Sequence, residues 1–313
     1  IGALETDIKS LKKAARQNVS PEILGRIEKI KKNGLLDLKN DFKIYWQDFP
    51  IAQLIPGKDY LNPDIRLVID DMIENDDQFK LEEYLKLWIN KKINQELKDL
   101  IDLKNMKETN SNIRALAYQI YENNGVVKKE NVNNFTKILN QEDRKILRKV
   151  GVKFGRYHVF LHKLFKPSIV FLRLLLWKNF YQKHLKVDPP KSGLNFLEDK
   201  NYIDQNLMLI CGFEKFENFY IRIDILERLF LKIIDSSKNE QNEVKLLPDM
   251  LNLLGCNKEN FIKVIKKMGY KVNVKNDDIY FKYLPPKKVK KASIPKEKNA
   301  DNPFKILKEM RFK

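Results

Sequence analysis

One stretch decides the fold: KENFIKVIKKMGYKVNVKNDDIYFKYL, residues 258–284. Its first half, Lys258 to Met268, predicts a helix that stops at Gly269, because glycine is the preferred residue just past a helix end. Its second half has apolar and aromatic residues on both sides of the turn sequence Asn276-Asp277-Asp278. This pattern predicts a β-hairpin from Tyr270 to Leu284.

Two further helices are predicted directly upstream of this stretch. The first runs from Ile225 to Asp235, and a short one lies near Asp249–Leu254 and is closed by Gly255. Three helices followed by a two-stranded ribbon are the plan of the winged helix, a variant of the helix-turn-helix. Residues 201–284 are therefore predicted to form a C-terminal winged helix.

A looser copy of this pattern occurs earlier in the chain. Helices are predicted at Asn112–Asn123, Val132–Leu139 and Glu142–Val150, followed by the strand-like segment Val152–Leu161. Pro167 and the apolar helix Ile169–Tyr181 follow at once, and that helix is shorter than the roughly 20 residues that cross a bilayer. Residues 107–186 are predicted to be a winged-helix-like unit with a buried helix.

The remaining segments complete an α+β fold that is mainly helical. Residues 1–106 predict two opening helices, a small antiparallel meander that includes Trp46, and an amphipathic helix from about Gln78 to Met106. Residues 187–200, with Pro189-Pro190, predict a linker. Residues 285–313 hold ten basic and three acidic side chains and predict a disordered basic tail.

The charge balance points to an anionic partner. Lys and Arg total 60 against 42 Asp and Glu, a net charge of +18. Such an excess attracts polyanions, of which nucleic acid is the commonest, with an anionic membrane surface as the main rival. The two cysteines cannot form a disulfide framework, which predicts a cytoplasmic protein.

The sequence predicts no catalytic site, metal or cofactor in this chain. Neither G-x-x-x-x-G-K-[ST] nor G-x-G-x-x-G occurs, so the glycine-rich loop that cradles phosphates is missing from the sequence. His158 and His162 are four apart, but in an extended segment that spacing separates them by about 13 Å. Two more ligands would also be needed for zinc.

Basic residues on the two predicted recognition helices and their wings are the candidate nucleic-acid-binding residues. They are Lys258, Asn260, Lys263, Lys266, Lys267, Lys271 and Lys275 in the second copy, and Arg144, Arg148, Lys149, Lys153 and Arg156 in the first. Lysine and arginine neutralise phosphates and release counterions, which gives affinity independent of sequence. Two other interpretations remain: a solvated helix face, or a protein-contact module. Of the interleaved aromatic residues, Tyr157, Tyr280 and Tyr283 are candidates for stacking bases, and Phe160 and Phe165 are predicted core.

Several runs of the sequence resemble one family. They are Arg114–Ile120 with Gly125-Val126, Arg148–Leu161, Leu164–Pro167, Leu172–Trp177, Leu251–Cys256, Met268–Tyr270 and Asn302–Phe304. Together they resemble the C-terminal extension of alphaproteobacterial superfamily 2 (DExH) helicases similar to the mitochondrial degradosome RNA helicase. The resemblance spans nearly the whole chain, and it carries no catalytic residues. At His162 the family often has proline instead.

This resemblance implies a non-catalytic region of an ATP-dependent helicase. ATP and magnesium would bind in motor domains upstream of Ile1, and RNA would be the preferred partner, with a nuclease or ribosomal protein as a further one. Two alternatives stay open: a stand-alone winged-helix regulator that binds duplex DNA, and a protein-interaction scaffold.

Overall fold

The computed structural model describes residues 36–68, 75–107, 110–182, 189–199, 204–237, 243–275 and 278–283, together with Gly25 and Glu28. The two predicted opening helices and the basic tail lie outside the described residues. Within the described part, helix accounts for 52% of residues and strand for 27%, in small antiparallel sheets. The mixed helix and strand class is thus confirmed.

The predicted meander is confirmed as a four-stranded antiparallel sheet. It contains β1 (Leu36–Leu38), β2 (Lys43–Trp46), β3 (Phe49–Asp59) and β4 (Asn62–Leu67) in the order β1-β2-β3-β4. Alternate residues of β4 are buried, because successive side chains of a strand point to opposite faces. The buried face packs on helices α2 and α7.

The helix predicted from about Gln78 to Met106 consists of two helices, α2 (Asn75–Glu96) and α3 (Lys98–Lys104). The break falls at Leu97, whose backbone leaves the helical region (φ −106°, ψ 21°) while its side chain stays fully buried. The change in direction keeps Leu100 and Leu103 of α3 in the same core as α2.

The middle unit (residues 110–182) contains the three predicted helices and one unpredicted strand. Its elements are α4 (Ser111–Glu122), β5 (Val126–Lys128), η2 (Lys129–Val132), α5 (Asn133–Ile138), α6 (Gln141–Lys149), β6 (Val152–Phe154) and β7 (His158–Leu161). The predicted strand-like segment is therefore a hairpin, and β5 adds to it in the sheet order β5-β7-β6.

The apolar helix at the end of the middle unit is buried, as predicted. After η3 (His162–Phe165), helix α7 (Pro167–Phe180) packs on β3 of the meander and on α8. Leu172 and Leu176 belong to one continuous core with the meander, so the predicted division near residue 106 does not separate two cores. No helix in the described segments is both long and apolar enough to cross a membrane.

The predicted linker contributes a strand. Residues 196–198 form β8 (Phe196–Glu198), which pairs with β10 (Phe219–Arg222), and β10 pairs with β9 (Phe213–Phe216) in the order β8-β10-β9. Phe196 stacks on Phe219 with ring centroids 5.0 Å apart, and this apolar contact accounts for the strand. A short helix, α8 (Gln205–Ile210), precedes β9.

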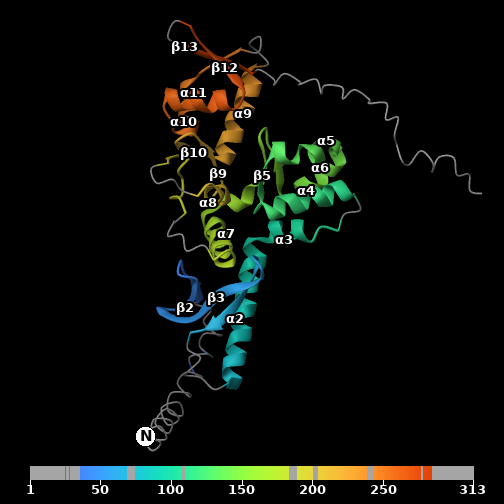
Figure 1. The fold of residues 1–313 in the computed structure, drawn as a ribbon, viewed down its shortest axis with the longest axis vertical. Helices are drawn as coiled ribbons and strands as arrows, with labels where there is room; N and C mark the ends of the chain where they lie inside the picture. The colour runs from blue at the N-terminus through green and yellow to red at the C-terminus, as the bar shows by residue number, and fades with distance from the viewer. Residues whose placement is uncertain are drawn as a thin grey trace, which may run out of the picture.

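The C-terminal unit (residues 204–283) continues with the predicted helices and hairpin. They are α9 (Ile223–Ser237), β11 (Glu243–Lys245), α10 (Pro248–Leu254), α11 (Lys258–Lys267), β12 (Tyr270–Lys275) and β13 (Asp278–Tyr283). The unpredicted strand β11 gives the sheet order β11-β13-β12. Figure 1 shows this unit at one end of the molecule and the meander at the other. The middle unit lies between them, with its helices α4, α5 and α6 to one side.

Candidate nucleic-acid interface

The outer face of α6 and the strand after it carry exposed cations. Helix α6 begins with a reciprocal cap: the Asn140 side chain accepts from the Asp143 N–H at 2.8 Å, and the Asp143 carboxylate accepts from the Asn140 N–H at 3.2 Å. Leu147 is fully buried and fixes the inner face of the helix. The exposed cationic side chains of α6 and β6 are Lys145, Arg148, Lys149 and Lys153; Gln141 and Glu142 are exposed in the first turn of the helix.

These four side chains make no ion pair with any carboxylate in the described segments. Arg148 is exposed and lies with its guanidinium 5.8 Å from the centroid of the Phe154 ring, a cation–π contact. Unpaired surface cations are the groups that neutralise backbone phosphates. This face, defined as Lys145, Arg148, Lys149 and Lys153, is called the α6 face below.

Arg144, by contrast, has a structural role. Its Nη2 donates to the carbonyl oxygen of Thr136 at 2.7 Å, and its Nε donates to that of Leu139 at 3.3 Å. Both acceptors lie at the C-terminal end of α5, where helix carbonyls lack partners. Arg144 was predicted to bind nucleic acid; its Nε and Nη2 tie α5 to α6, while its Nη1 makes no bond to the described residues.

The turn between β6 and β7 is held by the C-terminal unit. The Glu227 carboxylate of α9 accepts the backbone N–H groups of Arg156, Tyr157 and His158, the last two at 2.9 and 2.8 Å. The Arg156 guanidinium lies 4.7 Å from the centroid of Tyr283 on β13. The backbone of the predicted wing residue Arg156 is therefore held against the C-terminal unit, while its side chain is exposed.

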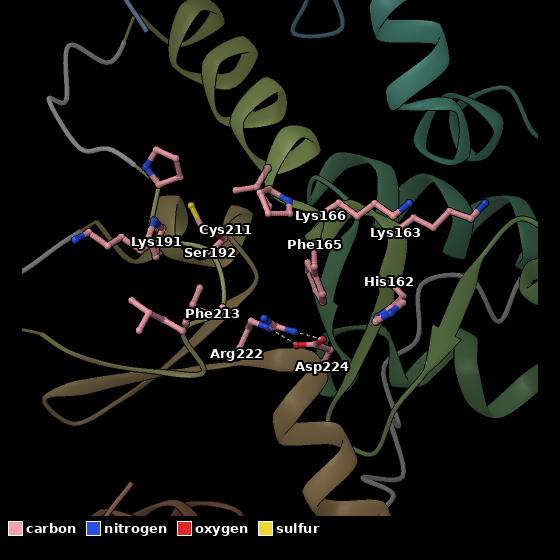
Figure 2. Close-up of a pocket in the computed structure, with 16 residues that line it drawn as sticks. His162, Lys163, Phe165, Lys166, Lys191, Ser192, Cys211, Phe213, Arg222 and Asp224 are labelled. Atoms are coloured by element: carbon pink, nitrogen blue, oxygen red, sulfur yellow. Dashed lines mark hydrogen bonds and ion pairs between the residues drawn. The ribbon is translucent and has the colours of Figure 1, made fainter. Parts of the chain in front are cut away.

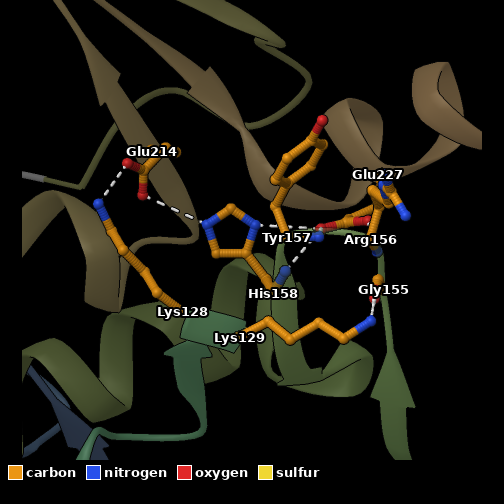
Figure 3. Close-up of polar contacts among 8 residues, drawn as sticks. All are labelled: Lys128, Lys129, Gly155, Arg156, Tyr157, His158, Glu214 and Glu227. Carbon is orange, nitrogen blue, oxygen red and sulfur yellow. Dashed lines mark hydrogen bonds and ion pairs between the residues drawn. The ribbon is translucent and has the colours of Figure 1, made fainter. Parts of the chain in front are cut away.

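A buried histidine completes this junction. His158 is 2% exposed, and its Nδ1 lies 3.1 Å from Glu227 while its Nε2 lies 3.3 Å from Glu214 of β9 (Figure 3). Both carboxylates can accept only if both ring nitrogens carry protons, so the geometry fits an imidazolium. Burial opposes the charge, but the hydrogen bonds to Glu214 and Glu227 outweigh it and raise the pKa of His158.

Lys128 adds a second cation to the junction. Its Nζ donates to Glu214 at 2.6 Å, so the two carboxylates face two cations. Burial alone would raise the pKa of Glu214, but the bonds from His158 and Lys128 bring it below its ordinary value. The sequence analysis weighed His158 as a metal ligand; in the structure its partners are the two carboxylates. The described residues contain no group of three side chains suited to a metal ion.

The predicted recognition helix of the C-terminal unit, α11, is partly committed to internal contacts. Lys263 pairs with Glu217 at 3.1 Å. Lys267 donates to the carbonyl oxygen of Lys215 and lies 4.8 Å from the centroid of Phe216, and burial lowers the pKa of Lys267. One flank of α11 is thus turned to strand β9 and the turn that follows it.

The other predicted residues of this unit divide into two groups. Lys258, Lys266 and Lys271 are exposed. Lys275 pairs with Glu243 of β11 at 3.0 Å, and the backbone N–H of Asn260 donates to the Asn257 side chain at 2.8 Å as part of the α11 cap. The structure therefore leaves Lys258, Lys266 and Lys271, three of the seven predicted residues here, as exposed cations with neither an ion pair nor an internal hydrogen bond or ring contact among the described residues.

The two units differ sharply in charge. Residues 110–182 contain 14 basic and 4 acidic side chains, an excess of ten, whereas residues 204–283 contain 13 and 12, an excess of one. Most of the net charge of +18 therefore comes from the middle unit and the basic tail. This contrast favours the α6 face over α11 as the phosphate-binding surface.

The aromatic residues named in the sequence analysis are largely structural. Tyr157 donates its hydroxyl to the Met268 carbonyl at 2.8 Å and packs edge-on against Phe230, so it fills the seam between the units. Phe160 is buried, as predicted, and stacks on the half-buried Phe165 at 5.4 Å. Tyr280 and Tyr283 are half-buried.

Sequence reasoning missed the junction carboxylates and Arg173. Arg173 on α7 is fully buried and donates to the carbonyl oxygens of Asn124 (2.5 Å), Leu164 (2.9 Å) and Ile210 (2.6 Å). Burial lowers its pKa to about 10, so it remains charged at neutral pH. An arginine inside an otherwise apolar helix is the signal that could have identified it.

Comparison with known proteins gives no relative: no family model, no curated protein and no solved structure matches the chain. The site is therefore interpreted from its own residues.

Proposed function

We propose that this chain is a non-catalytic nucleic-acid-binding region that grips a strand through the α6 face. The observation that carries the proposal is the set of four exposed cations without ion pairs in the described segments, on a unit with an excess of ten positive charges. Phosphate contacts of this kind are independent of sequence and can be remade at each step along a strand.

Winged-helix architecture is part of the proposal. In both units a helix, a strand, two helices and two strands follow in that order, and each sheet has its first strand beside its third. In a helix-turn-helix the second helix of the motif contacts the nucleic acid, and α6 occupies that position in the middle unit.

A parent helicase is proposed from the family resemblance alone. Motor domains that bind ATP and magnesium would lie upstream, RNA would be the preferred strand, and a nuclease or ribosomal protein would be a further partner in the cytoplasm. Reading the upstream coding sequence tests this part, because superfamily 2 motifs either precede Ile1 or do not.

The strand-binding proposal is tested by fluorescence anisotropy. The full chain is titrated into labelled single-stranded RNA and random duplex DNA at about 50 and 200 mM salt. Micromolar or tighter binding that weakens with salt is expected. The triple variant Lys145→Ala/Lys149→Ala/Lys153→Ala should weaken RNA binding about 10-fold at the lower salt and reduce the slope of log K against log salt by about 2.

The matched control removes three exposed lysines from the C-terminal unit, as Lys258→Ala/Lys266→Ala/Lys271→Ala. It alters net charge by the same amount, so a loss confined to the first variant places the contact on the α6 face. Equal losses would assign the affinity to overall charge. Absence of binding at 50 mM salt would refute the proposal, and strong preference for one duplex sequence would favour a DNA-binding regulator instead.

A further inference from the structure

A cleft that shares no lining residue with the α6 face lies where three segments distant in sequence meet. Its walls come from η3 and the start of α7, from residues 189–194, and from β9, β10 and the first turn of α9. Its volume is about 390 Å³. Clefts of roughly 300–1,000 Å³ are the size that takes small organic ligands.

One side of the cleft is apolar. Phe165, Val170 and Phe213 line it from the folded core, and Pro189, Pro190 and Leu194 face them from the connecting segment. Leu194 is 39% exposed, and its apolar surface is left uncovered at the edge of the cleft. Flat apolar and aromatic walls suit a planar ring better than a flexible chain.

Two contacts fix the position of the Phe165 ring. One contact is the stack on Phe160, with planes at 15°. The other is Gly212, whose backbone has φ +85°; a Cβ there would lie 2.7 Å from the Phe165 ring. Because glycine alone permits both this conformation and this approach, the apolar wall is held in place before any ligand binds.

A guanidinium is fixed at the floor of the cleft. Arg222 donates from Nε and Nη2 to the two oxygens of Asp224, at 2.7 and 2.8 Å. Its Nη1 makes no bond to the described residues and remains a donor for an anion. Figure 2 shows this pair below Phe165, with the ring of His162 directed toward it.

His162 offers an unsatisfied polar atom. Its Nδ1 is buried and has no hydrogen-bond partner among the described residues. Burial and the nearby Lys153 lower the pKa of His162, which keeps the ring neutral at neutral pH, when one ring nitrogen donates and the other accepts. The ring lines the cleft, so a ligand group can approach its accessible atoms there.

Lysines stand around the rim. Lys166 and Lys191 line the cleft from opposite sides (Figure 2), and neither has an ion pair with a described residue. Lys163 also lines it, but pairs with Asp99 at 3.1 Å. With Asp224 bound to Arg222 as the sole acidic lining residue, the cleft favours an anion.

We propose that this cleft binds a nucleotide, with the base against the apolar wall and the phosphate toward Arg222 and the rim lysines. The combination of a flat apolar wall, a neutral imidazole and a fixed guanidinium matches a heteroaromatic ring that carries a phosphate. The nucleotide is either one unit of the gripped strand or a free mononucleotide. Only the first of these two sources rests on the proposed function.

Calorimetric titration of the full chain with adenosine 5′-monophosphate, adenosine and inorganic phosphate tests the site. The nucleotide should bind at least 10-fold more tightly than either fragment. The rim variant Lys166→Ala/Lys191→Ala and the wall variant Leu194→Ala should each weaken nucleotide binding, by about 10-fold and about 3-fold. Their melting temperatures should match the unmodified chain, since all three side chains are exposed.

The variant Lys145→Ala/Lys149→Ala separates this site from the α6 face. It should weaken strand binding and leave the affinity for adenosine 5′-monophosphate unchanged. Photocrosslinking of an RNA that contains 4-thiouridine then identifies the source: adducts in peptides covering residues 162–170 or 189–199 indicate a strand nucleotide, and adducts elsewhere indicate a free one. Equal affinity for phosphate and nucleotide, or no binding at millimolar nucleotide, would overturn the proposal whatever the strand-binding result.

Discussion

The middle unit and the C-terminal unit have the same order of helices and strands, yet they present different parts of that plan to solvent. In the middle unit the β6–β7 turn is docked on Glu227, while the outer face of α6 is open and cationic. In the C-terminal unit α11 is held on one flank by Lys263 and Lys267. The excess of basic over acidic side chains differs in the same way: it is ten in the middle unit and one in the C-terminal unit.

The contrast shows that lysine on a helix is not by itself a binding surface. Lys267 and Lys149 are each the last residue of their helix, but the Lys267 ammonium lies over the Phe216 ring and donates to a carbonyl, whereas Lys149 makes no hydrogen bond, ion pair or ring contact with the described residues. Long cationic side chains cover apolar surface as readily as they contact a ligand. Which role a lysine has depends on the element packed beside it.

The largest effect is expected from breaking the junction that joins the units. Glu227→Ala leaves three backbone N–H groups and one side of the His158 ring without their acceptor in a buried site. Removing one partner of a buried charged network costs about 3–5 kcal/mol. Urea unfolding followed by circular dichroism should show this loss, and the exposed Glu217→Ala should change stability by less than about 1 kcal/mol.

A somewhat smaller loss is expected for Arg173→Met. Methionine fills much of the volume but leaves the carbonyl oxygens of Asn124, Leu164 and Ile210 without a donor. Each unsatisfied buried group costs about 1–3 kcal/mol, offset in part because a buried charge is no longer desolvated. We expect a net loss of about 2–4 kcal/mol in urea unfolding. An unchanged midpoint would mean that Arg173 does not fix α4, η3 and α8 together.

The junction should also make stability depend on pH. The pKa of His158 is raised above its usual 6.5, so its contribution is complete below about pH 6.5 and is lost as the pH rises through the higher folded value. The pKa of Glu214 is lowered, so its contribution is present above about pH 4.5 and is lost as the pH falls. The facing groups on the packed elements are Glu214, Glu227 and Lys128.

Unfolding free energy measured from pH 5 to 9 should therefore fall on the alkaline side, with a limiting slope of about 1.4 kcal/mol per pH unit for one proton. His158→Gln should flatten this slope, because an amide does not titrate. The same alkaline slope in the variant would show that another group causes it.

Much of the fold was predictable because its signals are local. Gly269 predicts the end of a helix, and the turn sequence Asn276-Asp277-Asp278 predicts a hairpin; the structure contains both. The alternation of buried and exposed residues in β4 is typical of a strand in the meander. The short strands β5, β8 and β11 were missed because three residues give no periodicity, and each forms by pairing with a strand distant in sequence.

The site was only partly predictable for a related reason. The sequence pattern identified Arg148, Lys149 and Lys153 but missed Lys145, and it could not separate Lys149 from Arg144, whose Nε and Nη2 donate to the Leu139 and Thr136 carbonyls. The acceptor Glu227 lies about 70 residues along the chain from the turn it binds, a separation that spacing within a helix or strand does not encode.

The smallest expected effect tests the comparison most directly. Lys263→Ala/Lys267→Ala removes two cations that the structure assigns to internal contacts, and Lys145→Ala/Lys149→Ala removes two that make no such contact with the described residues. The first pair should lower stability by about 1 kcal/mol and change RNA affinity less than 2-fold, since the exposed ion pair of Lys263 contributes little and the hydrogen bond and packing lost at Lys267 are modest. The second should leave stability within about 0.5 kcal/mol and weaken RNA binding several-fold. Both variants lose the same net charge, so anisotropy and urea unfolding on the same preparations separate location from charge. If the two pairs affected affinity equally, the lysines of α11 would contact the strand despite their internal bonds, and the two units would bind it together.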